Sequence, residues 1–246
     1  MSSQSGSVHP GPEELATAVA AELLELLARI QESGREPAIV LTGGTVADRI
    51  HRAVATAPAR AGVDWSSVHV WWGDERFVAS GDSDRNETQA RGALLDQVPL
   101  KPGHVHPMAA ADAAPDVEHA AADYARELGE AAGGAVSPVF DLVMLGVGED
   151  GHVASLFPGH AGLAAPGVTV GVHDSPKPPP ERVSLTFQAL NRAREVWFVA
   201  AGEGKAWAVR QAHHTGDDVS DVPARGVRGL ERTRWWLDAA AASRLG

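Results

Sequence analysis

A short, almost continuous apolar run from Phe140 to Leu145, interrupted only by Asp141, constrains the fold of this chain more than any other feature. Such a run is typical of a strand that is covered on both faces by helices, as in a parallel sheet. A glycine-rich turn follows it directly, with glycines at 146, 148 and 151. Because α/β proteins bind ligands at the carboxyl ends of such strands, this turn is a candidate binding loop.

The turn places Asp150 two residues before His152. The aspartate is a permanent acceptor and the imidazole titrates near neutrality, so the pair indicates acid–base chemistry. Two other interpretations stay open. GVGEDG formally matches the dinucleotide motif G-x-G-x-x-G, with Asp174 as a ribose-binding acid, although Pro158 and Gly159 leave little room for the helix that such a site needs. His152 can also be a purely structural histidine.

Strand-like and helix-like segments alternate along the rest of the chain. We expect helices over 13–30, through Ile50 and Val54, over 86–98, over 115–131 and after Gly204, and strands over 38–41, 68–72, 168–172, 183–187, 196–201 and 235–237. This alternation predicts an α/β fold with a mostly parallel sheet and helices on both faces.

Length and composition narrow the class of protein. We expect residues 1–12 to form a flexible lead-in without a signal peptide, and residues 13–246 to form one α/β domain without a membrane span. Cysteine is absent, which fits a cytoplasmic enzyme and excludes thiolate chemistry. A formal net charge of −11 argues against nucleic acid or an anionic membrane as a partner.

Polar loops follow four of the predicted strands, namely 42–45, 73–76, 148–152 and 202–205. Loops at the same edge of a parallel sheet meet in space and can build one pocket. The glycine pair at 43–44 exposes backbone amides before a helix, which is a favourable arrangement for an anion. Arg76 and Lys205 add full positive charges. We therefore expect a pocket for a phosphorylated ligand.

The same loops carry Asp74, Glu75, Asp150 and His152. Their spacing matches none of the usual metal-ligand patterns, so we expect no metal in this chain.

Five segments resemble the signature blocks of the 6-phosphogluconolactonase family: VWWGDERFV, SDRNETQAR, GVGEDGHVASLFPG, KPPPERVSLT and GEGKAWAV. The resemblance extends from about Val40 to Trp236. It implies a three-layer, Rossmann-like α/β fold and the hydrolysis of 6-phospho-D-glucono-1,5-lactone in the oxidative pentose phosphate pathway. It also implies that neither a metal nor an organic cofactor takes part.

By position, the resemblance places the general base on His152, with Asp150 beside it. We predict substrate contacts at Gly43, Gly44, Thr45, Asp74, Arg76, Arg182 and Lys205. Two positions depart from the family pattern: Val46 replaces a hydroxyl residue, and Arg85 replaces a serine that often precedes Asn86. One hydroxyl contact is therefore lost, and the supporting role of Asn86 stays open.

Two rival functions remain. A sugar-phosphate deaminase or isomerase of the same fold would use an acid near position 74 as its base, whereas a sugar-phosphate sensor would not need His152. Arg76 and the Ser155–Pro158 segment favour the lactonase. The expected partner is a phosphorylated sugar lactone, and we expect a monomer or a weak homo-oligomer.

Overall fold

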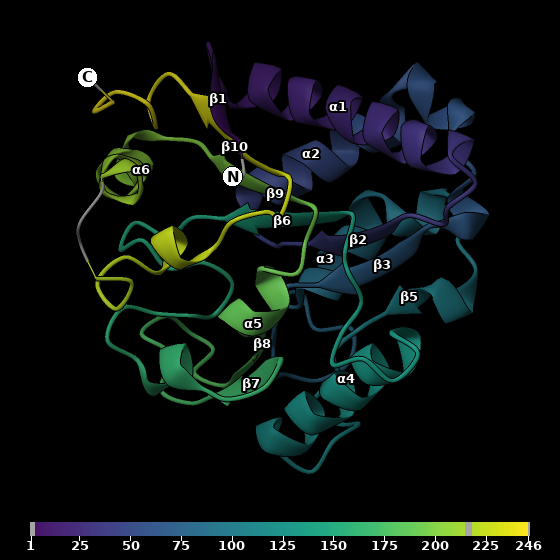
Figure 1. Cartoon of the computed structure of the whole chain (residues 1–246), viewed down its shortest axis with the longest axis vertical. Coiled ribbons are helices and arrows are strands. Elements are labelled where there is room, and N and C mark those ends of the chain that lie inside the picture. Colours follow the sequence, from purple (N-terminus) through teal and green to yellow (C-terminus); the bar gives the residue numbers. More distant parts are fainter. Residues whose placement is uncertain (1–2, 215–217, 246) are drawn as a thin grey trace.

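The computed structural model describes residues 3–214 and 218–245, and within them the core element is a seven-stranded parallel sheet (Figure 1). Neighbouring strands are parallel at every step of the sheet. In spatial order the strands are β1 (Ser3–His9), β10 (Arg232–Asp238), β9 (Glu195–Ala200), β6 (Leu142–Gly146), β2 (Ala38–Leu41), β3 (His69–Trp72) and β5 (Val105–His106).

Two apolar layers cover this sheet, because successive side chains of each strand point to opposite faces. In β2, Ile39 and Leu41 pack into one layer and Val40 into the other. The first layer contains α1 (Pro12–Glu32), α2 (Thr45–Thr56) and α3 (Asn86–Ala93), and the second contains α4 (Val117–Ala131), α5 (Phe187–Leu190) and α6 (Ala206–His213). In Figure 1, α1 and α2 lie above the sheet and α4 below it. The predicted three-layer, Rossmann-like α/β class is confirmed.

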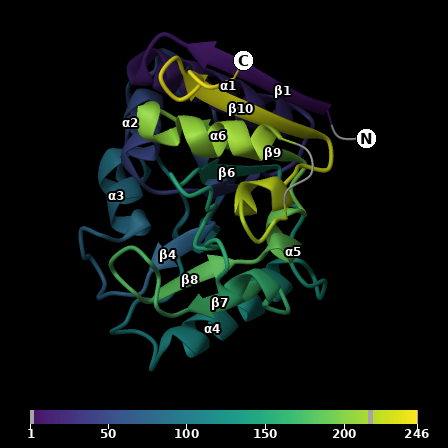
Figure 2. The ribbon, with the colours of Figure 1, turned by 90° about the vertical axis from the view of Figure 1, so that its left-hand side faces the viewer.

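A second, three-stranded antiparallel sheet lies in the layer of α4, as Figure 2 shows. It consists of β4 (Asp74–Arg76), β8 (Arg182–Leu185) and β7 (Thr169–Val172). The sequence pattern had suggested that the strands expected at 168–172 and 183–187 belong to the main sheet. It had also suggested that 73–76 is a loop. Both expectations were wrong, because burial on both faces gives the same apolar pattern in either sheet. Phe187 also opens α5 instead of ending a strand.

The expectation of a flexible lead-in fails for residues 3–9. They form β1, which pairs with β10 from Ser3↔Arg232 to His9↔Asp238. This serine- and glycine-rich segment lacks the alternating apolar residues that signal a strand, and its pairing uses backbone groups that any residue supplies. That the rest of the chain is one domain stays a prediction. Among the described residues, no helix is both long and apolar enough to cross a membrane.

The order of the strands reverses between β2 and β6. From β2 the chain continues to β3 and β5 on one side, whereas β6 is followed by β9 and β10 on the other. Such a reversal opens a crevice beyond the carboxyl ends of the two strands, which is where open α/β sheets bind ligands. The backbone amide of Gly146 lies 3.4 Å from Oγ1 of Thr42 across this point.

Candidate active site

A cavity of about 420 Å³ occupies the crevice between β2 and β6. Eight of the nine predicted site residues line it: Gly43, Gly44, Thr45, Asp74, Arg76, His152, Arg182 and Lys205. The ninth, Asp150, lies behind His152 and contacts it directly. Loops that are far apart in the sequence therefore meet at the carboxyl ends of the strands, as predicted.

Asp150 and His152 form a tight pair. Oδ1 of Asp150 lies 2.5 Å from Nδ1 of the imidazole and 3.2 Å from the backbone amide of His152. Burial raises the pKa of Asp150, but the hydrogen bond and charge of His152 outweigh burial and lower that pKa to about 2. A carboxylate only accepts, so Nδ1 carries the proton and Nε2 of the neutral ring keeps a lone pair. His152 can therefore take a proton at Nε2.

The glycines of the turn make this pairing possible. A Cβ at position 148 would lie 2.0 Å from Nδ1 of His152 and 2.4 Å from Oδ1 of Asp150. Gly151 has φ +86°, a conformation that side-chain-bearing residues rarely adopt. The turn is not followed by a helix: residues 147–160 contain turns and an isolated bridge between Val153 and Leu156. A dinucleotide site at GVGEDG would need a helix to bind the pyrophosphate, and no helix follows this turn within residues 147–160.

The glycine pair after β2 opens the other wall of the cavity. Gly44 precedes α2 with φ +93°, and no side chain caps this helix. The first amides of a helix have no acceptor within it. Those of Thr45, Val46 and Ala47 belong to residues that line the cavity. Val46 supplies no hydroxyl, but its amide stays available to an anion.

Asn86 joins the site, although its role was left open by the sequence. It lines the cavity, is 2 % exposed, and its Nδ2 donates to the carbonyl of Asp74 at 2.8 Å. Its Oδ1 is buried without a hydrogen-bond partner among the described residues. An unpaired buried acceptor beside a cavity is suited to a ligand hydroxyl. The motif SDRNETQAR was the only sequence signal for it.

Two lysines and two arginines line the cavity. Lys177, the first residue of the KPPPERVSLT segment, was not among the predicted site residues, but it lines the cavity together with Lys205. Burial and then the charge of Lys177 lower the pKa of Lys205. Within the described residues neither ammonium group forms an ion pair, and Nε of Arg76 is buried without a partner. These cations are available to an anionic ligand.

Arg182 has a different principal task. It is buried, and its guanidinium donates to the carbonyls of Lys177, Pro178 and Pro179 at 3.0 to 3.3 Å. It also lies over the ring of Phe157, 5.8 Å from its centroid. Arg182 therefore holds the loop that carries Lys177 over the cavity, in addition to lining it.

The two acids after β3 are both engaged. Oδ2 of Asp74 accepts from the hydroxyl of Ser155 at 2.7 Å and lies 4.0 Å from Nη1 of Arg182. Glu75, 1 % exposed, accepts the amides of Arg76, Asn86 and Glu87 at 2.7 to 2.8 Å and so caps α3. Burial raises the pKa of Glu75, while Arg85 and these amides oppose the shift. Glu75 does not line the cavity.

The chain is similar to proteins of known family. Residues 10–236 match the family model described as glucosamine-6-phosphate isomerases/6-phosphogluconolactonase. A 6-phosphogluconolactonase of Streptomyces coelicolor is 51% identical over 244 residues, 97% of this chain and 93% of the relative. One from Mycobacterium leprae is 46% identical over 211 residues, 84% of each chain. The solved 6-phosphogluconolactonase of Trypanosoma brucei superposes with a TM-score of 0.84 at 26% identity and covers 100% of both chains.

Proposed function

The chain belongs to the glucosamine-6-phosphate isomerase/6-phosphogluconolactonase family, and we propose from this that it hydrolyses 6-phospho-D-glucono-1,5-lactone to 6-phospho-D-gluconate. This reaction belongs to the oxidative pentose phosphate pathway. The observation that carries the proposal is the Asp150–His152 pair, whose ring lines the same cavity as Arg76, Lys177 and Lys205.

His152 acts as the general base. Nε2 takes a proton from water as the oxygen of that water adds to the lactone carbonyl. Asp150 holds the ring in the required tautomer and stabilises the imidazolium. The tetrahedral intermediate then collapses, the bond from C1 to the ring oxygen breaks, and that oxygen receives the proton. The new carboxylic acid ionises, so each turnover releases one proton to the solvent.

The cationic residues that line the cavity bind the phosphate. Lys177 and Lys205 provide point charges without a carboxylate partner among the described residues, and α2 directs its free amides at the same space. Oδ1 of Asn86 accepts from a sugar hydroxyl. Nε of Arg76 is a further donor, either to the phosphate or to the oxyanion of the intermediate.

The position of Glu75 removes one candidate base of a deaminase or isomerase. A base that abstracts a carbon-bound proton needs a carboxylate oxygen that is free to reach the substrate. Glu75 caps α3 outside the cavity lining and does not meet this need. Asp74 lines the cavity and accepts from Ser155 through Oδ2, so Arg76 and the Ser155–Pro158 segment remain the features that favour the lactonase. A sensor without catalysis would in turn have no use for a paired His152.

One assay separates these functions. The lactone is generated in situ by glucose-6-phosphate dehydrogenase, and acid release is followed at constant pH above the spontaneous rate. We expect a large acceleration by the wild-type chain and almost none by His152→Ala. In parallel, glucosamine 6-phosphate is offered and ammonia is measured. Ammonia release with no effect on lactone hydrolysis would replace the proposed activity by the deaminase, and binding of the sugar phosphate without turnover would leave the sensor.

We further propose that the enzyme works in the cytoplasm as a monomer or weak homo-oligomer, with small phosphorylated sugars as its partners and not nucleic acid or membranes. The cysteine-free composition and the net charge of −11 support this setting.

A further inference from the structure

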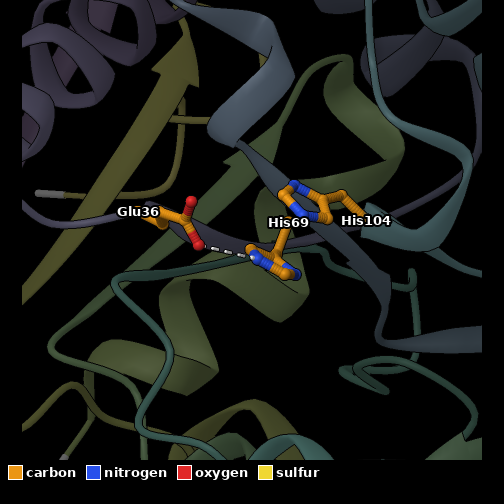
Figure 3. A group of neighbouring side chains, drawn as sticks. All are labelled: Glu36, His69 and His104. Carbon is orange, nitrogen blue, oxygen red and sulfur yellow. Dashed lines mark hydrogen bonds and ion pairs between the residues drawn. The ribbon is translucent and has the colours of Figure 1, made fainter.

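A cluster of histidines and glutamates lies at the amino ends of β2, β3 and β5, the opposite end of these parallel strands from the candidate active site. Side-chain donor atoms of Glu36, His69 and His104 lie within 4.8 Å of one another. Figure 3 shows the carboxylate of Glu36 and the ring of His104 next to the ring of His69. None of these residues lines the cavity around His152. The proposed lactonase mechanism makes no use of them.

Strand register brings the three residues together. His69, the first residue of β3, pairs with Ala38, and its amide donates to the carbonyl of Pro37 at 2.8 Å, so Glu36 lies alongside. Val105 of β5 pairs with Val70, which places His104 beside His69 on the other side. The three residues are far apart in the sequence, so no short ligand motif marks them.

A chain of hydrogen bonds sets the tautomer of His69 when both imidazoles are neutral. Oε1 of Glu127 lies 2.6 Å from Nδ1 of His106, and Nε2 of His106 lies 3.1 Å from Nδ1 of His69. Since a carboxylate only accepts, Nδ1 of His106 must donate, and Nε2 of a neutral His106 must accept. Nδ1 of His69 therefore carries a proton, and Nε2 of a neutral His69 is left with a lone pair.

That lone pair faces a second acceptor. Nε2 of His69 lies 3.4 Å from Oε2 of Glu36. Between a neutral ring and a carboxylate no proton is available to join these two atoms, so a cation is the natural occupant of the space between them.

We propose that Glu36, His69 and His104 bind one divalent transition-metal ion of the Zn²⁺ type, with Glu127 and His106 as the outer residues that orient His69. Two imidazole nitrogens and a carboxylate oxygen are a donor set that suits Zn²⁺. With bonds of about 2.0 to 2.1 Å, tetrahedral ligands lie about 3.4 Å apart, which is the separation of the His69 and Glu36 atoms. A metal-binding histidine usually donates its other ring N–H to an outer acceptor, and here Nε2 of His106 is that acceptor for Nδ1 of His69.

His104 supplies the second, independent observation. Its Nδ1 is buried and has no hydrogen-bond partner among the described residues. The ring stacks on His69 with the centroids 3.9 Å apart, and no hydrogen bond within the described chain holds it there. A turn of this side chain completes the three-residue site without breaking a polar contact.

The proposal predicts a structural role. The ion would join the segment before β2 to the starts of β3 and β5, and β5 is the edge strand of the sheet with only two residues. Binding to the folded state alone raises thermal stability through mass action. Because the ligands lie outside the cavity, hydrolysis should not depend on the ion.

The test uses the full chain stripped with EDTA and titrated with Zn²⁺ by calorimetry, with Co²⁺ as a spectroscopic probe of the ligand field. We expect one equivalent of Zn²⁺ and a higher melting temperature in the wild type. Glu36→Gln and His104→Ala, both at partly or fully exposed positions, should weaken binding by at least tenfold. Glu127→Gln should weaken it about 10- to 100-fold, as for other lost outer-shell partners.

Two variants serve as controls. His119→Ala removes an exposed histidine that pairs with Asp116 elsewhere on the surface, and His152→Ala removes the candidate base. Both should bind Zn²⁺ like the wild type. The proposal fails if the wild type binds no Zn²⁺, if Glu36→Gln and His104→Ala bind it unchanged, or if His152→Ala abolishes binding, since the ion would then occupy the catalytic cavity.

Discussion

Oδ1 of Asn86 occupies the space that a side chain on residue 43 would need, because a Cβ built on Gly43 would lie only 1.8 Å from that oxygen. Nδ2 of the same side chain donates a hydrogen bond to the carbonyl of Asp74, so the side chain has little freedom to move away. Gly43 and Asn86 therefore form one unit of the cavity wall, although they come from different loops.

Gly43→Ala should displace Asn86 or the glycine loop and lower kcat/KM for the phosphorylated lactone by roughly a hundredfold, the effect of a misplacement of about 1 Å. The matched control is Gly92→Ala, at an exposed helical position where a Cβ would meet nothing within 4 Å. It should retain full activity and gain about 0.5 to 1 kcal/mol of stability. Equal kinetics for both variants would contradict the steric role assigned to Gly43.

His152→Ala should lower kcat by about two to four decades without unfolding the chain, the usual effect of losing a general base. Asp150→Asn should also lower kcat, because an amide does not hold the imidazole in one tautomer as a carboxylate does. Steady-state kinetics and circular dichroism measure both. Retention of more than a third of the wild-type kcat by His152→Ala would place the base elsewhere, with Asp150 as the next candidate.

Lys205→Ala should lower kcat/KM for 6-phosphogluconolactone about 10- to 100-fold, or about 1.5 to 3 kcal/mol for a charge-assisted bond, and should barely change the rate on unphosphorylated gluconolactone. Lys177→Ala and Arg76→Ala should show the same selectivity if they too bind the phosphate. Lys101, exposed and outside the cavity, is the control lysine. If Lys205→Ala slows both lactones equally, the residue serves catalysis or the fold.

The free energy of unfolding should fall as the pH is lowered from about 6.5 to 4, because His51 is buried as a neutral imidazole. Burial lowers its pKa to about 4, against a slight opposing effect of Asp48. In this range the imidazole is protonated in the unfolded chain but not in the folded chain. The contribution of His51 to stability is therefore fully present above the unfolded pKa and is lost below it, by up to roughly 3 kcal/mol. In urea denaturation, His51→Leu should remove this part of the decline; parallel curves for the two proteins would exclude His51 as its source.

Hydrolysis should proceed without a metal ion, because His152 activates water directly in the proposed mechanism. Dialysis against EDTA should leave kcat unchanged while it lowers the melting temperature through loss of the ion near His69. Complete loss of activity that a divalent cation restores would show that a metal takes part in catalysis.

Several elements were predictable because their signal is local. The β2 strand was expected at 38–41 and found at Ala38–Leu41, and α1 follows from apolar residues spaced by three and four from Leu15 to Ile30. The small sheet of β4, β8 and β7 was not predictable, because β4 pairs with β8 more than a hundred residues away and an apolar run does not show which sheet it joins. Asn86 and Lys177 were identified as cavity residues only in the structure, because contacts between distant loops cannot be read from the sequence of either loop.

The sequence by itself determined the α/β class and the predicted chemistry, since strand and helix periodicities and motifs such as Asp150-Gly151-His152 are written in neighbouring residues. Only the tertiary structure decided which side chains share a cavity and which are already engaged. Asp74 and Glu75 look like free acids in the sequence, yet one is held by Ser155 and the other caps α3. The histidine cluster likewise exists only through strand register, because contacts between distant segments depend on the packed sheet and not on spacing along the chain.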